Sequence, residues 1–159
     1  MDLAKLQVEA FKNIVVRKGV VGYANLTDVR VAITPDGFTV FAIPEIDLFI
    51  DRTKMVETPI LRNMFDKVPG SVEVIGTVSK CIYKGGLGSP YLVKIYSADN
   101  PQVCAYCNKS YYDKYNSDLY TAHITDNRTA IRFFNDTTGA VNHVILPVYV
   151  RQEKTENAT

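Results

Sequence analysis

The side chains that could do chemistry in this chain are those of three cysteines and two histidines. They are Cys81, Cys104, Cys107, His123 and His143. Three sulfurs and one imidazole nitrogen make a ligand set for structural zinc. The C-x-x-C spacing of Cys104 and Cys107 argues against that use, because residues 103–107 have the composition of a strand, in which side chains three apart point to opposite faces. We therefore expect buried, inert thiols and no bound metal or other cofactor.

The two histidines are the groups that titrate near neutrality and could serve as general bases. His123 and His143 each lie in a strand-like segment, on faces that can be exposed to solvent. No serine or cysteine stands in a recognisable nucleophile elbow, and no acidic pair has a distinctive spacing. The sequence therefore favours a protein that is not an enzyme. A small enzyme or metal-binding domain built on the cysteines and histidines is an alternative.

The glycine-rich segment 84–90 has some of the composition of a phosphate-binding loop. Such a loop requires a following helix, whose N-terminal amides face the anion, and a lysine after the glycines. Here Lys84 precedes the glycines, and a strand-like segment follows them. We interpret residues 84–90 as a hairpin connection.

Tyrosine is unusually frequent, with ten tyrosines and no tryptophan. Five of them are clustered in the sequence and interleaved with lysines: Tyr106, Tyr111, Tyr112, Tyr115 and Tyr120. Tyrosine supplies a large amphipathic contact area with little conformational entropy to lose, which suits cores and interfaces. We expect Tyr111, Tyr112 and Tyr115 to pack in the core or at a subunit interface. Contact with a partner protein and stacking on single-stranded bases are the other interpretations.

Hydrophobic periodicity indicates the elements that position these residues. Residues 3–16 repeat apolar side chains at helical spacing and predict a helix with one buried face. That face comprises Leu3, Leu6, Ala10 and Ile14, widened by Phe11 and Val15. A short strand over 5–9 before a helix that starts at Ala10 is the alternative. Alternating apolar residues predict strands over 29–33, 38–43 and 46–50, with Pro35-Asp36-Gly37 as a turn.

The rest of the chain continues as short helices and strands. Residues 58–68 predict a helix with Thr58 as its N-cap. Another short helix is expected over 109–118, capped by Asn108 or Ser110. The expected strands are 72–78, 81–83, 91–96, 103–107, 119–125, 129–135 and 141–151, and the polar tail 152–159 is expected to be disordered.

This order of elements predicts an α+β fold with a mostly antiparallel sheet and two or three short helices. The connections between strands are too short for the crossover helices that parallel pairing requires. With 159 residues, the chain can bury one good core and has little room for a second domain. We therefore expect a single domain over residues 1–151.

Both halves of the chain follow a recognisable pattern. The opening half has a helix near 8–18, a segment over 26–33, a turn at Gly37 and strands over 38–50. The closing half has a strand over 105–108, a helix over 109–118, a hairpin over 120–134 and an apolar-Pro-apolar ending around Pro147. The pattern resembles a domain of the bacterial DNA-polymerase sliding clamps, or processivity clamps. The resemblance implies a DNA-clamp-like fold.

The resemblance also implies how the protein works. Clamp chains carry two or three such domains and close into a ring of six, so a chain with one domain would assemble from six copies. Clamps place basic residues on the helices that face DNA, and the matching positions here are Lys5, Lys12, Arg17, Lys18, Lys109 and Lys114. Such residues would make a salt-sensitive, sequence-independent contact with phosphates. A solvated helix face without a ligand is the alternative.

Charge and composition limit these interpretations. The chain has 18 Lys+Arg and 17 Asp+Glu, a net charge of +1, so any positive surface must be local. Three cysteines do not make a disulfide framework, the first residues lack a secretory apolar run, and no apolar run is long enough to span a membrane. We expect a cytoplasmic protein without membrane contact.

The function that these observations predict is non-enzymatic binding. We expect a clamp-like, phage-related homo-oligomer that acts in DNA replication through contact with duplex DNA or with a replication protein. A protein-interaction module of the same fold, with no role on DNA, is the alternative.

Overall fold

The computed structural model describes residues 3–16, 19–27, 29–34, 37–43, 52–66, 69–84, 90–125 and 130–150. Several predictions fall on the remaining residues: the strand over 46–50, most of the glycine-rich segment, the tail 152–159, Arg17 and Lys18.

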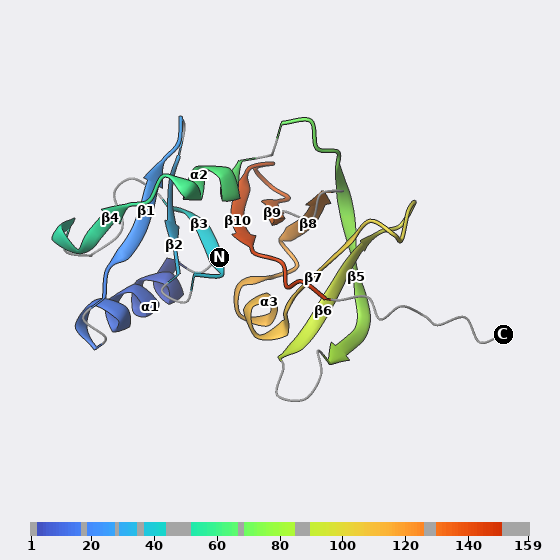
Figure 1. Ribbon diagram of the computed structural model, residues 1–159, viewed down its shortest axis with the longest axis horizontal. Coiled ribbons are helices and arrows are strands. Elements are labelled where there is room, and N and C mark those ends of the chain that lie inside the picture. Colours follow the sequence, from blue (N-terminus) through green and yellow to red (C-terminus); the bar gives the residue numbers. More distant parts are fainter. Residues whose placement is uncertain are drawn as a thin grey trace.

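Three α-helices and ten strands make up the described part of the chain (Figure 1). The helices are α1 (Leu3–Val15), α2 (Ile60–Phe65) and α3 (Lys109–Tyr115), and a short 3-10 helix spans Arg52–Lys54. The strands are β1 (Val21–Asn25), β2 (Arg30–Ile33), β3 (Thr39–Ile43), β4 (Met55–Glu57), β5 (Glu73–Lys84), β6 (Tyr91–Ser97), β7 (Cys104–Asn108), β8 (Tyr120–Thr125), β9 (Ile131–Asn135) and β10 (Val141–Ile145).

The strands pair in the order β4-β1-β2-β3-β10-β9-β8-β5-β6-β7. Neighbours are antiparallel except β1 and β4, which pair in parallel, so the sheet is mixed. These pairings confirm the α+β class with a mostly antiparallel sheet and short helices.

The helices differ from the predictions mainly at their ends. α1 confirms the helix over 3–16 and excludes the strand over 5–9. α2 begins at Ile60, so Pro59 and not Thr58 takes the N-cap position, and no side chain caps the helix; the Thr58 hydroxyl donates to the Val56 carbonyl (3.1 Å). Asn108 caps α3, since its side-chain oxygen accepts from the Ser110 amide (2.9 Å).

The strands show three further differences. β1 and β4 were not expected, because β1 contains Gly22 and β4 has only three residues, too few to show alternation. The predicted strands 72–78 and 81–83 are one strand, β5, with a register irregularity between Val78 and Ile82. The last strand ends at Ile145 instead of 151.

The sheet contains the same succession of elements twice. A helix is followed by three antiparallel strands in α1-β1-β2-β3 and again in α3-β8-β9-β10. The third strands of the two units, β3 and β10, pair antiparallel through Phe41 and His143 and their neighbours. We call this junction the seam.

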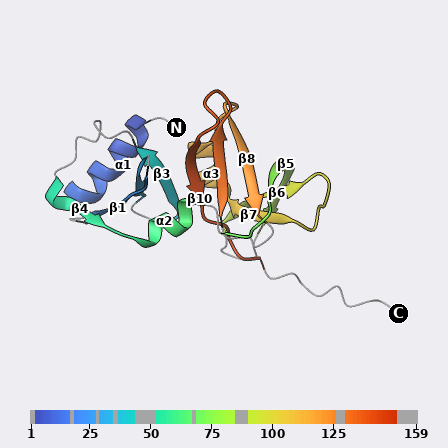
Figure 2. The same ribbon diagram turned by 90° about the horizontal axis from the view of Figure 1, so that it is seen from above.

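Helices cover both faces of the sheet. α1 and α3 lie on one face, and α2 lies on the opposite face of β1–β3 (Figure 2). The core under α1 and α3 contains Ala10, Val21, Ala32, Phe41, Ile43 and Tyr115. The core under α2 contains Ala24, Val31, Val40, Leu61, Phe65, Ala130 and Val144. Neighbouring residues such as Val40 and Phe41 belong to different cores because side chains alternate along a strand.

Strand β5 connects the two parts of the sheet. Its residues 73–75 pair with β8, and residues 76–84 pair with β6. Gly76 lies where the partner changes, and a Cβ atom there would be 2.3 Å from Cγ2 of the buried Ile95. The bend therefore needs a glycine. Beyond it, β6 and β7 pack on β8–β10 around Val93, Ile95, Ala105, Cys107, Ala122, Ile124, Ile131, Phe133 and Ile145.

An ion pair ties the start of β5 to β9. The Arg132 guanidinium lies 2.8 Å (Nε) and 2.6 Å (Nη2) from Oε1 of Glu73, and both side chains are largely buried. Nη1 of Arg132 is also 3.5 Å from the Phe65 carbonyl at the end of α2. One side chain thus contacts three segments that are far apart in the sequence.

Candidate functional site

Helices α1 and α3 form the surface to which the sequence assigned the basic residues. Lys114 Nζ on α3 lies 3.0 Å from Oε1 of Glu9 on α1. Beneath this pair, Ala10 and Tyr115 share one core. The fold therefore brings together two helices that are about a hundred residues apart in the chain. We call this surface the helix layer.

The lysines of the helix layer are partly neutralised by neighbouring carboxylates. Lys109 forms an ion pair with Asp113 one turn along α3. Glu9 contacts both Lys114 and Lys12, the latter at 3.9 Å. Lys5 is exposed. Since α1 and α3 carry four lysines, one glutamate and one aspartate, the layer keeps a modest positive charge.

The three tyrosines predicted at an interface lie on α3 and contact the core to different extents. Tyr115 is buried in the chain's own core, with its ring 4.9 Å from that of Phe41 in an edge-to-face contact. Tyr111 stacks on Phe38 (5.5 Å) and Tyr112 packs near Phe133 (6.1 Å), and both remain partly exposed. Tyr111 and Tyr112 therefore keep surface that a partner can reach, whereas Tyr115 does not.

The prediction placed Phe11 on the wrong side of α1. Phe11 was expected to widen the buried face, but its side chain is 61% exposed, and Val8 one turn earlier is 51% exposed. Phe11 follows Ala10 by about 100° around the helix, which places it beyond the edge of the buried stripe. Val8 and Phe11 therefore form an exposed apolar patch that sequence periodicity did not identify.

His143 is not on an exposed strand face as predicted; its side chain is wholly buried at the seam. Its ring lies among those of Phe41 (5.7 Å), Phe133 (4.5 Å) and Tyr120 (5.5 Å). Burial lowers the pKa of His143 to about 3, so the imidazole is neutral. It cannot reach a substrate as a general base.

The other groups with possible chemistry are also constrained. Cys104 and Cys107 are buried free thiols, and burial raises the pKa of Cys107 to about 12. Burial lowers the pKa of His123, whose ring packs 4.2 Å from that of Phe134. The described residues contain no cluster of three or more histidine, cysteine, aspartate or glutamate side chains that could hold a metal ion.

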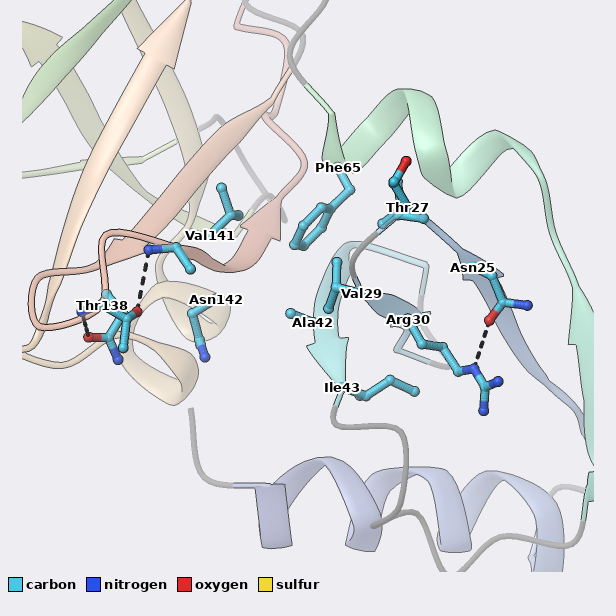
Figure 3. A pocket seen from close by; sticks show the side chains of 13 residues that line it. Asn25, Thr27, Val29, Arg30, Ala42, Ile43, Phe65, Thr138, Val141 and Asn142 are labelled. Atoms are coloured by element: carbon cyan, nitrogen blue, oxygen red, sulfur yellow. Dashed lines mark hydrogen bonds between the residues drawn. The ribbon is translucent and has the colours of Figure 1, made fainter.

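A groove of about 860 Å³ opens at the seam, on the side where α2 ends (Figure 3). It forms because β3 and β10 diverge beyond Phe41 and His143. Past these two residues, β3 and β10 no longer pair with each other: Ile43 of β3 pairs with β2, and Val141 of β10 pairs with β9. The register between β9 and β10 shifts between Val141 and His143. The lining residues are Asn25, Leu26, Thr27, Val29, Arg30, Ala42, Ile43, Phe65, Asn135, Thr138, Ala140, Val141 and Asn142. We call it the seam groove.

The seam groove combines an apolar floor with a polar rim. Phe65, Val29 and Val141 project toward one another across it (Figure 3). Arg30 is the charged side chain of the lining; its Nε donates to Asn25 (2.8 Å), and its guanidinium lies 5.8 Å from the Tyr23 ring centroid. Sequence analysis missed this groove because it depends on pairing between strands about a hundred residues apart.

Comparison with models of known protein families, with curated proteins and with solved structures found no match to this chain. Within the described ranges, no helix has the length and apolar character needed to cross a membrane.

Proposed function

We propose that this chain is a non-enzymatic, clamp-like binding protein that self-associates and contacts duplex DNA through its helix layer. The observation that supports this most is the repeated helix-and-three-strand unit, joined at the seam so that α1 and α3 share one face. Two adjacent helices on one face of a sheet are the arrangement that the sliding-clamp resemblance implies for the surface facing DNA.

The charge of the helix layer predicts which lysines contribute most. Lys5 and Lys12 are exposed on α1. Lys12 lies 3.9 Å from the Glu9 carboxylate, which is a longer contact than the 3.0 Å between Glu9 and Lys114, so Lys5 and Lys12 should contribute most. Lys109 and Lys114 must exchange an ion pair for a phosphate. We therefore expect weak binding that depends steeply on salt and not on base sequence.

Self-association in this proposal uses the exposed apolar patch of α1. Val8 and Phe11 are one turn apart, and a monomer exposes both apolar side chains to water, which is unfavourable. A second copy that covered this patch would also place further lysines beside the first set. A closed ring would concentrate a modest positive charge on its inner wall.

The test combines native mass with DNA binding. Light scattering during gel filtration should give a defined oligomer, and six times the monomer mass of 17.8 kDa would favour encirclement. Binding to a fluorescent duplex should weaken as salt rises, with a slope of about −0.9 in log K against log salt for each phosphate contacted. A monomer at all concentrations would remove encirclement as a mechanism.

Matched variants separate the helix layer from general charge effects. Lys5→Gln with Lys12→Gln should weaken duplex binding and flatten the salt slope. Lys54→Gln with Arg62→Gln removes the same charge from exposed positions off the helix layer and should leave binding nearly unchanged. Equal effects of both pairs would contradict a role for the helix layer.

The seam groove favours a second candidate, a protein-interaction module without a role on DNA. An apolar floor with Phe65 and Val141 beside one arginine suits an extended peptide that carries an apolar side chain and a carboxylate. Selection from a displayed random-peptide library should then enrich acidic, apolar peptides. Their binding should be lost in Arg30→Gln and Val141→Glu, and under this candidate the wild-type chain should show no salt-dependent binding to duplex DNA.

A further inference from the structure

The outer face of β5, β6 and β7 carries tyrosines around a central lysine. Along these strands, alternate residues enter the core: Val93, Ile95, Ala105 and Cys107. Their neighbours face outward, and the register places Lys94 opposite Tyr106. Tyr96 lies two residues along β6 from Lys94, and Tyr83 lies opposite Leu92. We call the set Tyr83, Lys94, Tyr96 and Tyr106 the tyrosine face.

The rings of the tyrosine face are held by mutual contacts. Tyr83 and Tyr106 meet edge to face, with 5.5 Å between centroids and 86° between planes. Lys94 Nζ lies 5.9 Å from the ring centroids of both Tyr96 and Tyr106. In an edge-to-face pair, the ring that contributes its edge has neither face covered by the other. The partner ring therefore leaves one ring of the pair uncovered, and both tyrosines lie near or beside the Lys94 ammonium group, partly exposed to solvent.

The segment after β10 extends this surface. The Val148 amide donates to the Tyr106 carbonyl (2.7 Å), which holds the segment along β7. Tyr149, the next residue, is 86% exposed. A hollow of about 220 Å³ is lined by Tyr106 and Tyr149 together with Cys104 and Pro147 among others. An aromatic side chain with so little contact to its own chain is free to stack on a ligand.

The charges of these strands suit a polyanion. β5, β6 and β7 carry Lys80, Lys84 and Lys94. Their acidic residue, Glu73, is ion-paired with Arg132 at the far end of β5. Lys94 lies on the tyrosine face itself, whereas Lys84 pairs with Tyr91 on the other side of the sheet, so Lys94 is the cation that these strands place among the rings.

We infer that the tyrosine face, with Tyr149, binds single-stranded nucleic acid. Aromatic side chains that stack on bases, combined with cations that contact the backbone, are the features that bind single strands without reading sequence. A duplex keeps its bases stacked inside and cannot use such rings. Figure 1 places β5–β7 at the end of the molecule away from α1, so this surface is separate from Lys5 and Lys12 of α1.

Fluorescence anisotropy of the full chain with labelled single-stranded oligothymidine tests this inference. Tyr106→Ala and Tyr149→Ala should each weaken binding by about five-fold or more, as expected when one base loses its stacking partner. Tyr106→Phe keeps the ring and should bind like the wild type. Lys94→Gln should weaken binding and reduce the slope of log K against log salt by about 0.7.

Tyr91→Ala is the matched control, because Tyr91 is 58% exposed on β6 but lies on the opposite side of the strand from Lys94. Tyr149→Ala also protects the test against misfolding, since its exposed side chain adds little to stability. Absence of oligothymidine binding at low salt would overturn the inference, as would equal losses in Tyr91→Ala. If Tyr106→Ala or Tyr149→Ala changed the native mass of the protein and left oligothymidine binding unchanged, the tyrosine face would be a contact between copies of the chain, and the inference would be wrong. Duplex binding is measured separately with the Lys5 and Lys12 variants. The proposed duplex contact of the helix layer and the single-strand contact of the tyrosine face can therefore fail independently.

Discussion

The imidazole of His143 lies parallel to the phenyl ring of Phe133, with 4.5 Å between their centroids and 3° between their planes. His143 also pairs with Phe41 across the seam, so this stack lies where the two halves of the sheet meet. Nδ1 of His143 is 3.0 Å from Oδ1 of Asn142, while Nε2 has no hydrogen-bond partner among the described residues. A proton on Nε2 would place an unsatisfied charge in the core.

This burial predicts a loss of stability in acid. The folded pKa of His143 is about 3 and the unfolded value is near 6.5, so between these values the unfolded chain binds the extra proton. The stability conferred by the neutral imidazole is complete above pH about 6.5 and is lost as the pH falls toward 3. Over that interval, the free energy of unfolding should fall by about 1.4 kcal/mol per pH unit more in the wild type than in His143→Phe.

Urea unfolding at several pH values between about 7 and 4 measures this difference. His123→Gln is the control: His123 is less buried, so the variant should keep most of the wild-type slope. Parallel slopes for wild type and His143→Phe would show that His143 is not the responsible group.

Glu9→Gln should strengthen duplex binding if the helix layer contacts DNA. The substitution removes the carboxylate that neighbours both Lys12 and Lys114. Each lysine released to contact a phosphate should steepen log K against log salt by about 0.9. The pair is partly exposed, so stability should change by less than about 1 kcal/mol. Glu57→Gln, an exposed glutamate on β4, should leave the slope unchanged, and no gain with Glu9→Gln would argue against these lysines.

Arg132→Met should destabilise the fold by about 3 kcal/mol, because it leaves Glu73 largely buried without its partner. Chemical denaturation measures the loss. Adding Glu73→Gln should recover part of it by removing the uncompensated charge. Arg62→Met, at an exposed position on α2, should change stability by no more than about 0.5 kcal/mol. A similar effect of the two arginine substitutions would refute the importance of the pair.

Gly76→Ala should destabilise the chain by about 1 to 3 kcal/mol, since the new methyl group overlaps the buried Ile95 side chain. The neighbouring Thr77→Ala, at an exposed position, is the control and should be close to neutral. In a double-mutant cycle, Gly76→Ala with Ile95→Ala should cost less than the sum of the two single changes. Strict additivity would mean that the two side chains do not compete for space.

Local patterns predicted the elements whose signals are local. The helix over 3–16, the Asn108 cap of α3 and the strand composition of 103–107 depend on residues within a few positions of one another. The seam groove and the burial of His143 depend on the pairing of β3 with β10, which no local pattern encodes. Phe11 shows that a local pattern can also mislead, because an apolar residue at the edge of a helical stripe can face either the core or solvent. The tyrosine face required the register of three strands before its members could be seen as neighbours.

The course of β5 has a consequence for how the molecule comes apart. One continuous backbone supplies hydrogen bonds to β8 at one end and to β6 along the rest. Neither ladder can separate without disturbing the other. The β6–β7 hairpin and the seven strands on the β8 side of β5 should therefore unfold in a single transition. Amide protons of residues on both sides of Gly76 should then exchange with deuterium at a common slow rate, as members of one cooperative block.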